Sequence, residues 1–317
     1  MVYRILVTGS SGLIGSVLTR ALLARGIHVV CFDLRAKGDE QGDIIHATQV
    51  RNAVAHVHGI VHLAAVSRVI WAEQNPDLCA ATNITGVNNV LAGIRRAKPR
   101  PWLIFASSRE VYGQATTMPV DEDCPLRPIN VYGRSKVAGE ELIEQAKLDD
   151  VRACTVRFSS VYGLAADHPN RVVPAFARAA ARGQILNIEG PGHTFDFTHV
   201  GDVVRGLLTV IDWMMERRPL PPPIHFVSGQ PTTLAELASL ALSLAKPGAK
   251  SLTVPPRGGD VTHFVGDPAR AQALLGWRAR IPLAAGMAQL IADYRVRPKP
   301  IVEKPEECYW WDARNCS

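Results

Sequence analysis

Apolar residues in this 317-residue chain gather in short runs that alternate with longer helical segments as far as residue 163. Short apolar runs rich in β-branched residues indicate buried strands, and apolar positions three and four apart indicate helices. Because strands that alternate with helices usually pair in parallel, we expect an α/β fold of Rossmann type with a doubly wound parallel sheet. The predicted strands are residues 3–8, 28–33, 59–64, 102–107 and 152–158, and the predicted helices are 12–25, 76–97 and 130–147.

The pattern changes after residue 163. Residues 174–182 are helical in composition, and the prolines of 219–223 form a stiff connector before an apolar strand at 224–227. Thr233 and Glu236 have the spacing of a capping box before a further helix. We therefore expect a Rossmann domain over 1–165. Residues 166–317 are expected to form mainly a smaller substrate-binding lobe with a C-terminal tail, while segments near 195–228 return to the first domain.

Composition narrows the class of protein. Hydrophobic residues make up 47% of the chain and the mean hydropathy is +0.04, which is typical of a globular enzyme. We find no transmembrane run and no signal peptide, so a cytoplasmic protein without a membrane partner is expected. The six cysteines (31, 79, 124, 154, 308 and 316) show neither a Cys-x-x-Cys pair nor zinc spacing, so no metal site is predicted.

The net charge of +6 and the pI of about 9.1 raise the question of nucleic-acid binding. That function needs basic residues concentrated in a stripe with aromatic side chains between them. Here the basic residues are dispersed, apart from clusters at 95–100 and 217–218 where helices are expected to end. The charge distribution argues against a nucleic-acid partner and fits anionic small ligands.

A glycine-rich turn follows the first predicted strand. Gly9, Gly12 and Gly15 stand between that strand and a helix, where glycines let the backbone approach a pyrophosphate and the helix N-terminus stabilises its charge. The second predicted strand ends on Asp33. A carboxylate there accepts hydrogen bonds from a ribose 2′-hydroxyl and repels a 2′-phosphate, so the cofactor is predicted to be NAD rather than NADP.

Tyr132 and Lys136 lie four residues apart on one face of the helix predicted at 130–147. A free tyrosine titrates near pH ~10 and is a poor base at neutral pH. A neighbouring lysine and an oxidised nicotinamide would both lower the tyrosine pKa. The pair is therefore predicted to move a proton in redox chemistry at an alcohol carbon.

The glycine spacing Gly-x-x-Gly-x-x-Gly together with Tyr132 and Lys136 resembles the extended branch of the short-chain dehydrogenase/reductase superfamily, which includes nucleotide-sugar epimerases and dehydratases. Further similar segments are spread along most of the chain, at 42–44, 61–65, 75–83, 105–113, 157–163, 196–203, 257–260 and 267–277. The resemblance implies cofactor contacts from Gly9, Gly12, Leu13, Ile14, Gly15, Asp33, Asp43, Ile44, Leu63, Ala64, Ala65, Asn83, Ser107, Tyr132 and Lys136.

The same resemblance implies catalytic roles for Ser108 and Glu110 beside Tyr132 and Lys136. Ser108 would hydrogen-bond the oxygen that Tyr132 deprotonates and steady the developing carbonyl. Related 4,6-dehydratases carry an Asp-Glu pair where this chain has Arg109-Glu110. Because arginine stays charged, it cannot serve as the acid of a dehydration. Glu110 is left with either a catalytic role or a structural pairing with Arg109 or a loop amide.

The predicted substrate contacts lie in several segments. Phe195 stands where the resemblance implies an arginine that contacts the nucleotide, and Arg257 matches a second family arginine that would bind the diphosphate. Ser159 stands where many sugar epimerases have an asparagine. The full predicted set is Ser67, Ser108, Arg109, Ser159, Asn170, Val173, Phe195 and Arg257.

The leading hypothesis is an NAD-dependent nucleotide-diphosphate-sugar epimerase that acts at C4 through a 4-keto intermediate, with Tyr132 as acid/base. The alternatives within enzymes are a 4,6-dehydratase, a decarboxylase or a 4-keto reductase that uses Glu110. An alternative of another class is a non-catalytic protein that senses NAD(H). By resemblance, the helices at 76–97 and 130–147 would pair with their copies in a homodimer.

Overall fold

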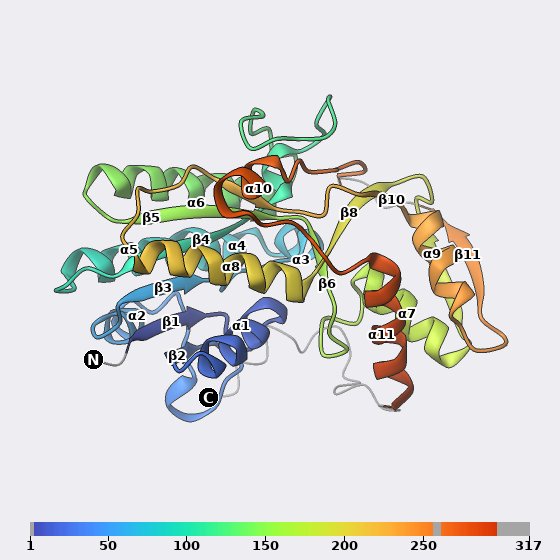
Figure 1. The fold of residues 1–317 in the computed structure, drawn as a ribbon, viewed down its shortest axis with the longest axis horizontal. Coiled ribbons are helices and arrows are strands. Elements are labelled where there is room, and N and C mark those ends of the chain that lie inside the picture. Colours follow the sequence, from blue (N-terminus) through green and yellow to red (C-terminus); the bar gives the residue numbers. More distant parts are fainter. Residues whose placement is uncertain (1–2, 256–260, 297–317) are drawn as a thin grey trace.

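The computed structural model describes residues 3–255 and 261–296. Within those residues, the larger of the two lobes is built on a parallel sheet of six strands, in the order β2-β1-β3-β4-β5-β9 (Figure 1). The order runs outward from β1 in two directions, as in a doubly wound sheet, so the predicted fold class is confirmed. The strands are β1 (Arg4–Thr8), β2 (His28–Phe32), β3 (Gly59–His62), β4 (Trp102–Ser108), β5 (Ala153–Phe158) and β9 (Ile224–Phe226).

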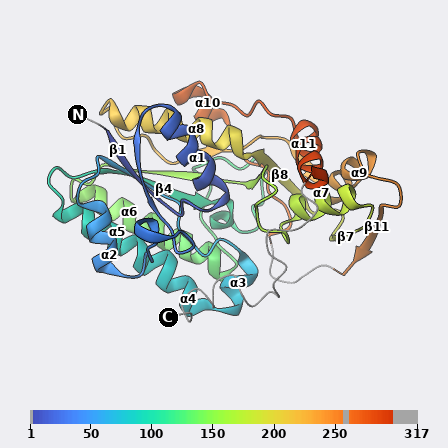
Figure 2. The ribbon, with the colours of Figure 1, turned by 90° about the horizontal axis from the view of Figure 1, so that it is seen from below.

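Helices cover both faces of this sheet (Figure 2). Side chains alternate across each strand, so Ile5 and Val7 of β1 join the core on one face while Leu6 joins the core on the other. The first face carries α1 (Leu13–Ala24) and α8 (Val200–Met215), and α10 (Ala269–Leu275) lies beside α8. The opposite face carries α2 (Ala47–Val54), α5 (Gly86–Arg96) and α6 (Val131–Leu148).

The predicted helix at 76–97 is continuous but changes its winding. It comprises α4 (Pro76–Ala80), a π-helical turn at Ala81–Thr85, and α5. Asn75 caps its start by accepting a hydrogen bond from the Leu78 amide at 3.3 Å. A π-turn swings the following side chains around the helix axis, and this one carries Asn83, whose contacts are described below.

The smaller lobe packs around its own core beside the carboxyl ends of the large sheet (Figure 1). Its helices are α7 (Val172–Arg182), α9 (Leu234–Ser243) and α11 (Leu283–Val296). The predicted capping box of α9 is present, because Thr233 and Glu236 exchange their side-chain and backbone hydrogen bonds. Two small sheets complete the lobe, one of β6 (Ser160–Tyr162), β8 (Thr194–His199) and β10 (Pro231–Thr233), the other of β7 (Ile185–Glu189) and β11 (Lys250–Val254).

The chain returns to the first domain after β8, because α8 packs on α1 and β9 pairs with β5. β8 itself belongs to a small sheet. The division near residue 165 stays a prediction. No helix in the described part of the chain is long and apolar enough to cross a membrane.

Candidate active site

A large cleft of about 1760 Å³ opens between the carboxyl ends of the sheet strands and the smaller lobe. One wall is built from the turn after β1, the ends of β2, β3 and β4, and the start of α6. The other is built from the segment 158–176, β7 and β8. The carboxyl edge beside the point where strand order reverses is the usual ligand site of such sheets.

The glycine turn leaves no room for side chains. Gly9 adopts a φ of +71°, and a Cβ there would lie 2.7 Å from the Ala64 amide nitrogen. A Cβ on Gly15 would lie 2.1 Å from the Gly9 carbonyl oxygen. The turn is therefore compressed against β3 and α1, with the N-terminus of α1 facing the cleft. This is the cradle that a dinucleotide pyrophosphate requires.

Asp33 lines the cleft just after the end of β2. It is buried, and its carboxylate accepts hydrogen bonds from the Ser11 amide at 3.0 Å and the Arg35 amide at 2.8 Å. Each carboxylate oxygen can accept a further bond, so a ribose hydroxyl would fit there. Asp43 and Ile44 line the cleft beside it, as do Leu63, Ala64 and Ala65. The tight glycine turn and this acceptor fit NAD.

Asn83 is not among the residues that line the cleft. Its side chain is buried behind the wall, where it bonds both backbone groups of Val66, at 2.8 and 3.1 Å, and the Ser135 hydroxyl at 2.8 Å. These contacts show that Asn83 fixes the loop after β3. Its contact with the cofactor stays a prediction.

The Tyr132 and Ser108 side chains meet on the wall of the cleft. A hydrogen bond with the Ser108 hydroxyl lowers the pKa of Tyr132, but burial has the larger effect and raises that pKa to about 12. Ser108 also accepts a hydrogen bond from the Glu110 amide at 3.2 Å, which fixes its position at the end of β4. Both hydroxyls line the cleft.

The predicted lowering of the tyrosine pKa by Lys136 is not found in the protein alone. The Lys136 Nζ donates to the Ala106 carbonyl oxygen at 2.8 Å and lies 5.9 Å from the centre of the Tyr132 ring. Burial lowers the pKa of Lys136 itself to about 8. Desolvation therefore outweighs the attraction that the four-residue spacing suggested, because it penalises both charged forms.

Arg109 and Glu110 are paired at the start of the short helix η3 (Arg109–Tyr112). One Glu110 oxygen lies 3.0 Å from the Arg109 Nη2, and the other accepts a hydrogen bond from Asn130 at 2.8 Å. The Arg109 guanidinium also lies over the Phe195 ring, 4.6 Å from its centre. Both oxygens of Glu110 thus have fixed partners, while its charge raises the pKa of nearby Tyr132.

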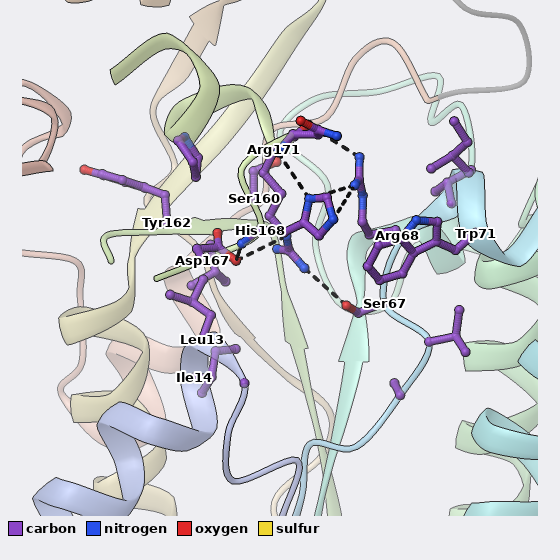
Figure 3. A pocket seen from close by; sticks show the side chains of 18 of the residues that line it. Leu13, Ile14, Ser67, Arg68, Trp71, Ser160, Tyr162, Asp167, His168 and Arg171 are labelled. Atoms are coloured by element: carbon purple, nitrogen blue, oxygen red, sulfur yellow. Dashed lines mark hydrogen bonds and ion pairs between the residues drawn. The ribbon is translucent and has the colours of Figure 1, made fainter. Parts of the chain in front are cut away.

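Two segments meet across the cleft, and we call their contacts the clasp: residues 67–71 after β3 and residues 167–171 before α7 (Figure 3). The Arg68 guanidinium bonds the His168 ring at 2.8 Å, and the Trp71 ring meets the His168 ring edge-on at 4.8 Å. Arg171 donates to the Ser67 hydroxyl at 3.2 Å. Burial, and then Arg68, lowers the pKa of His168 to about 3, so its ring is neutral and accepts the hydrogen bond from Arg68.

The comparisons with known proteins agree with this geometry. Residues 5–219 match the model of the NAD dependent epimerase/dehydratase family. This chain belongs to that family. The UDP-glucose 4-epimerase of Mycolicibacterium smegmatis is 30% identical, and the alignment covers 92% of this chain and 98% of that protein.

Solved structures give the same result for this family member. The UDP-glucose 4-epimerase of Thermotoga maritima, crystallised with UDP-glucose, superposes with a TM-score of 0.85 at 26% identity over 93% of this chain and all of that one. MoeE5 in complex with UDP-glucuronic acid and NAD gives 0.84 at 28% identity over the same shares. The resemblance predicted from the sequence is confirmed, and NAD is the cofactor of this epimerase/dehydratase.

Most of the substrate residues predicted for this epimerase/dehydratase lie on the cleft wall. Those that line the cleft are Ser67, Ser108, Arg109, Ser159, Asn170, Val173 and Phe195. Ser159 also donates a hydrogen bond to the Asp196 carbonyl oxygen. Arg257 lies outside the described residues. Ser107 lines the cleft as predicted, and its buried hydroxyl has no hydrogen-bond partner within residues 3–255 and 261–296.

Among the residues of the clasp that were not predicted from the sequence are Trp71, Asp167 and His168. Asp167 is buried, with one carboxylate oxygen unpaired among the described residues, and burial raises its pKa. The short apolar stretch Val69–Gln74 carries no cap that would mark it as a helix. The residues that meet across the cleft are about a hundred positions apart, so no local pattern could have paired them in this family member.

Proposed function

We propose that this chain is an NAD-dependent 4-epimerase of a UDP-sugar. The observation that carries the proposal is the pairing of the Tyr132 and Ser108 hydroxyls in the cleft that also contains the glycine turn and Asp33. A cofactor cradle beside a proton-transfer pair suits oxidation and reduction at a single carbinol carbon. The names of the relatives, which are UDP-glucose and UDP-glucuronate 4-epimerases, support C4 and the uridine nucleotide.

Tyr132 takes the proton from the C4 hydroxyl and returns it when the keto group is reduced. Ser108 binds the same oxygen, which steadies it as a carbonyl and as an alcohol. Lys136 is buried with its ammonium on the Ala106 carbonyl, 5.9 Å from the centre of the Tyr132 ring, and so holds positive charge near the tyrosine. The glycine turn and Asp33 would hold NAD, which would supply a reversible hydride acceptor for C4, so that the hydride could return to the opposite face of the 4-keto sugar.

Glu110 makes dehydration the weaker candidate. A dehydratase or decarboxylase that used Glu110 as acid or base would need its carboxylate free to reach the sugar. Here one oxygen is held by Arg109 and the other by Asn130. The proposal therefore assigns no proton transfer to Glu110.

The experiment incubates the purified protein with UDP-glucose, UDP-galactose and UDP-glucuronate, each without added NAD, and follows the sugar protons by NMR. We expect one substrate to approach an equilibrium mixture of its C4 epimers with no net NADH. Release of carbon dioxide, a 4-keto-6-deoxy product or dependence on added NADH would overturn the proposal.

Two further proposals concern the context of the protein. A homodimer through the helices at 76–97 and 130–147, and a cytoplasmic location, are supported by the family resemblance and the composition. Sedimentation of the purified protein would test the first, since a monomer at micromolar concentration would contradict it.

A further inference from the structure

Arg109 links the reacting centre to the smaller lobe. Its backbone follows Ser108 directly, so the side chain begins beside the hydroxyl that contacts Tyr132. Its guanidinium lies 4.6 Å from the centre of the Phe195 ring on β8 and 5.8 Å from that of Phe264. Arginine stacks well on aromatic faces, so the two rings hold the guanidinium plane in place.

A second set of contacts fixes Arg109 relative to the catalytic tyrosine. Glu110 holds its Nη2 at 3.0 Å and is held in turn by the Asn130 amide at 2.8 Å. The Asn130 side-chain oxygen accepts from the Gly133 amide at 2.7 Å and so caps the start of α6, which carries Tyr132. The guanidinium and the tyrosine therefore belong to one hydrogen-bonded unit.

Arg109 keeps donor capacity that the protein does not use. Its Nη1 is buried and has no hydrogen-bond partner within the described ranges. The side chain as a whole is 14% exposed and lines the cleft. A buried donor without a partner is unfavourable, and a charged one more so. A ligand oxygen at this wall would relieve that penalty.

The chemistry of the substrate indicates which part of it reaches Arg109. The reacting sugar carbon must lie at Tyr132 and Ser108, and Arg109 lines the same cleft. Phe195 of β8 and Leu186 and Asn187 of β7 line this cleft as well. The diphosphate is the group between sugar and base, and a guanidinium fork binds phosphate oxygens well.

We infer that Arg109 binds the diphosphate of the nucleotide-sugar substrate, and that Glu110 and Asn130 position it for that role. The inference rests on the proposed function, because it takes the substrate to be a nucleotide-diphosphate sugar. It also gives a physical reason for Phe195, since an arginine there would bring a second cation against Arg109. Glu110 is then a positioning residue and not a catalytic one.

The first experiment compares binding of UDP and uridine to the intact protein by calorimetry. Arg109→Met should weaken UDP binding by roughly 10- to 100-fold, the range expected for a hydrogen bond to a charged group, and leave uridine binding unchanged. Unchanged UDP affinity would overturn the inference. So would an equal loss of UDP and uridine affinity, which would mean that the pocket had been damaged.

A relocated charge supplies the matched control. The double variant Arg109→Met, Phe195→Arg carries a guanidinium on β8 at the same wall of the cleft. Its UDP affinity should recover at least in part from the loss caused by Arg109→Met alone. Failure to recover in a protein that still binds uridine would count against a diphosphate contact here. If the wild-type protein bound no UDP and converted no UDP-sugar, the proposed function itself would fail.

Glu110→Gln separates positioning from catalysis. A glutamine keeps the hydrogen-bonding shape but removes the charge that holds Arg109. We expect KM for the UDP-sugar to rise severalfold while kcat changes little, because the proton is still moved by Tyr132. General acid–base catalysis contributes about 100-fold or more to turnover. If kcat instead fell by that amount with KM unchanged, Glu110 would be catalytic and its positioning role would be overturned.

Discussion

Tyr132 retains its proton more firmly than a free tyrosine does, although it is the proposed base. Burial raises its pKa to about 12, and only the Ser108 hydroxyl and the more distant charge of Arg171 oppose that rise. The sequence correctly indicated which two side chains share a helix face, since i and i+4 spacing dictates it. It could not indicate their pKa values, because desolvation depends on packing from Val66, Ala72 and Cys79 around the tyrosine ring.

Tyr132→Phe should leave the fold and the bound NAD intact and slow turnover by about 100-fold or more, the range that general acid–base catalysis supplies. The ring fills the same space, so only the proton donor and acceptor is lost. Turnover is measured by NMR, and bound cofactor by absorbance after denaturation. Retention of a tenth or more of the wild-type turnover rate would contradict the acid/base role.

Lys136→Met tests whether burial lowers the pKa of the lysine, through the pH dependence of the free energy of unfolding. The folded-state pKa of Lys136 is lowered from 10.5 to about 8, so the folded protein carries a penalty below pH ~8 that it loses as the pH rises toward ~10.5. In cofactor-free protein, the free energy of unfolding of the wild type should therefore rise relative to the variant's across that window, by up to about 1.4 kcal/mol per pH unit.

Urea titrations of both proteins at several pH values measure this difference, and the other titrating groups cancel because both proteins contain them. A constant difference between pH 7 and 10 would show that the folded protein does not depress the lysine pKa. The variant should also lose catalytic activity, since the charge near the tyrosine is gone.

At the scale of elements, the strands of the large sheet were predicted to within a residue or two, because buried parallel strands are short apolar runs with clear ends. Helix α8 was not predicted. It packs against α1 and the large sheet, and its buried side chains include Val203, Leu207 and Ile211. Its buried positions recur three and four residues apart, so the amphipathic period of a helix was present in the sequence and was overlooked.

Gly15→Ala should abolish retention of NAD, because the new Cβ would lie 2.1 Å from the Gly9 carbonyl oxygen and 2.9 Å from the Ser10 Cα. The backbone of the turn must move, and the cradle moves with it. NAD released from the purified, denatured protein measures the effect. Gly192→Ala is the control, since a Cβ there meets nothing within 4 Å. Equal NAD content in wild type and Gly15→Ala would contradict a role for the turn in cofactor binding.

At the scale of the whole molecule, two lobes with separate cores enclose one cleft, and the clasp joins them across it. The sequence suggested where the pattern changes, because the strand–helix alternation stops near residue 163, but the division into domains stays a prediction. The clasp was not visible in the sequence, because its contacts join segments about a hundred positions apart through side chains with no periodic signature. Long-range pairing of single side chains is the part of a site that local patterns do not encode.

His168→Ala should speed release of NAD about tenfold, the effect of losing roughly 1.4 kcal/mol of contact between the two lobes. The variant removes the ring that Arg68 and Trp71 share. Exchange of bound NAD against labelled NAD measures the rate. His28→Ala, an exposed histidine on β2, should leave the rate unchanged. Equal rates in wild type and His168→Ala would mean that the clasp does not retain the cofactor.

The clasp bears on how far the bound cofactor exchanges with the NAD and NADH around the protein. In an epimerisation the hydride that leaves the sugar returns to the same molecule, so the cofactor ends each cycle in the form in which it began. A dinucleotide that dissociates slowly compared with turnover does not equilibrate with the cell's NAD and NADH. If the Arg68–His168 contact slows that dissociation, the oxidation state of the bound cofactor is isolated from the NAD and NADH of the compartment, and fewer turnovers are lost to a wrongly reduced cofactor.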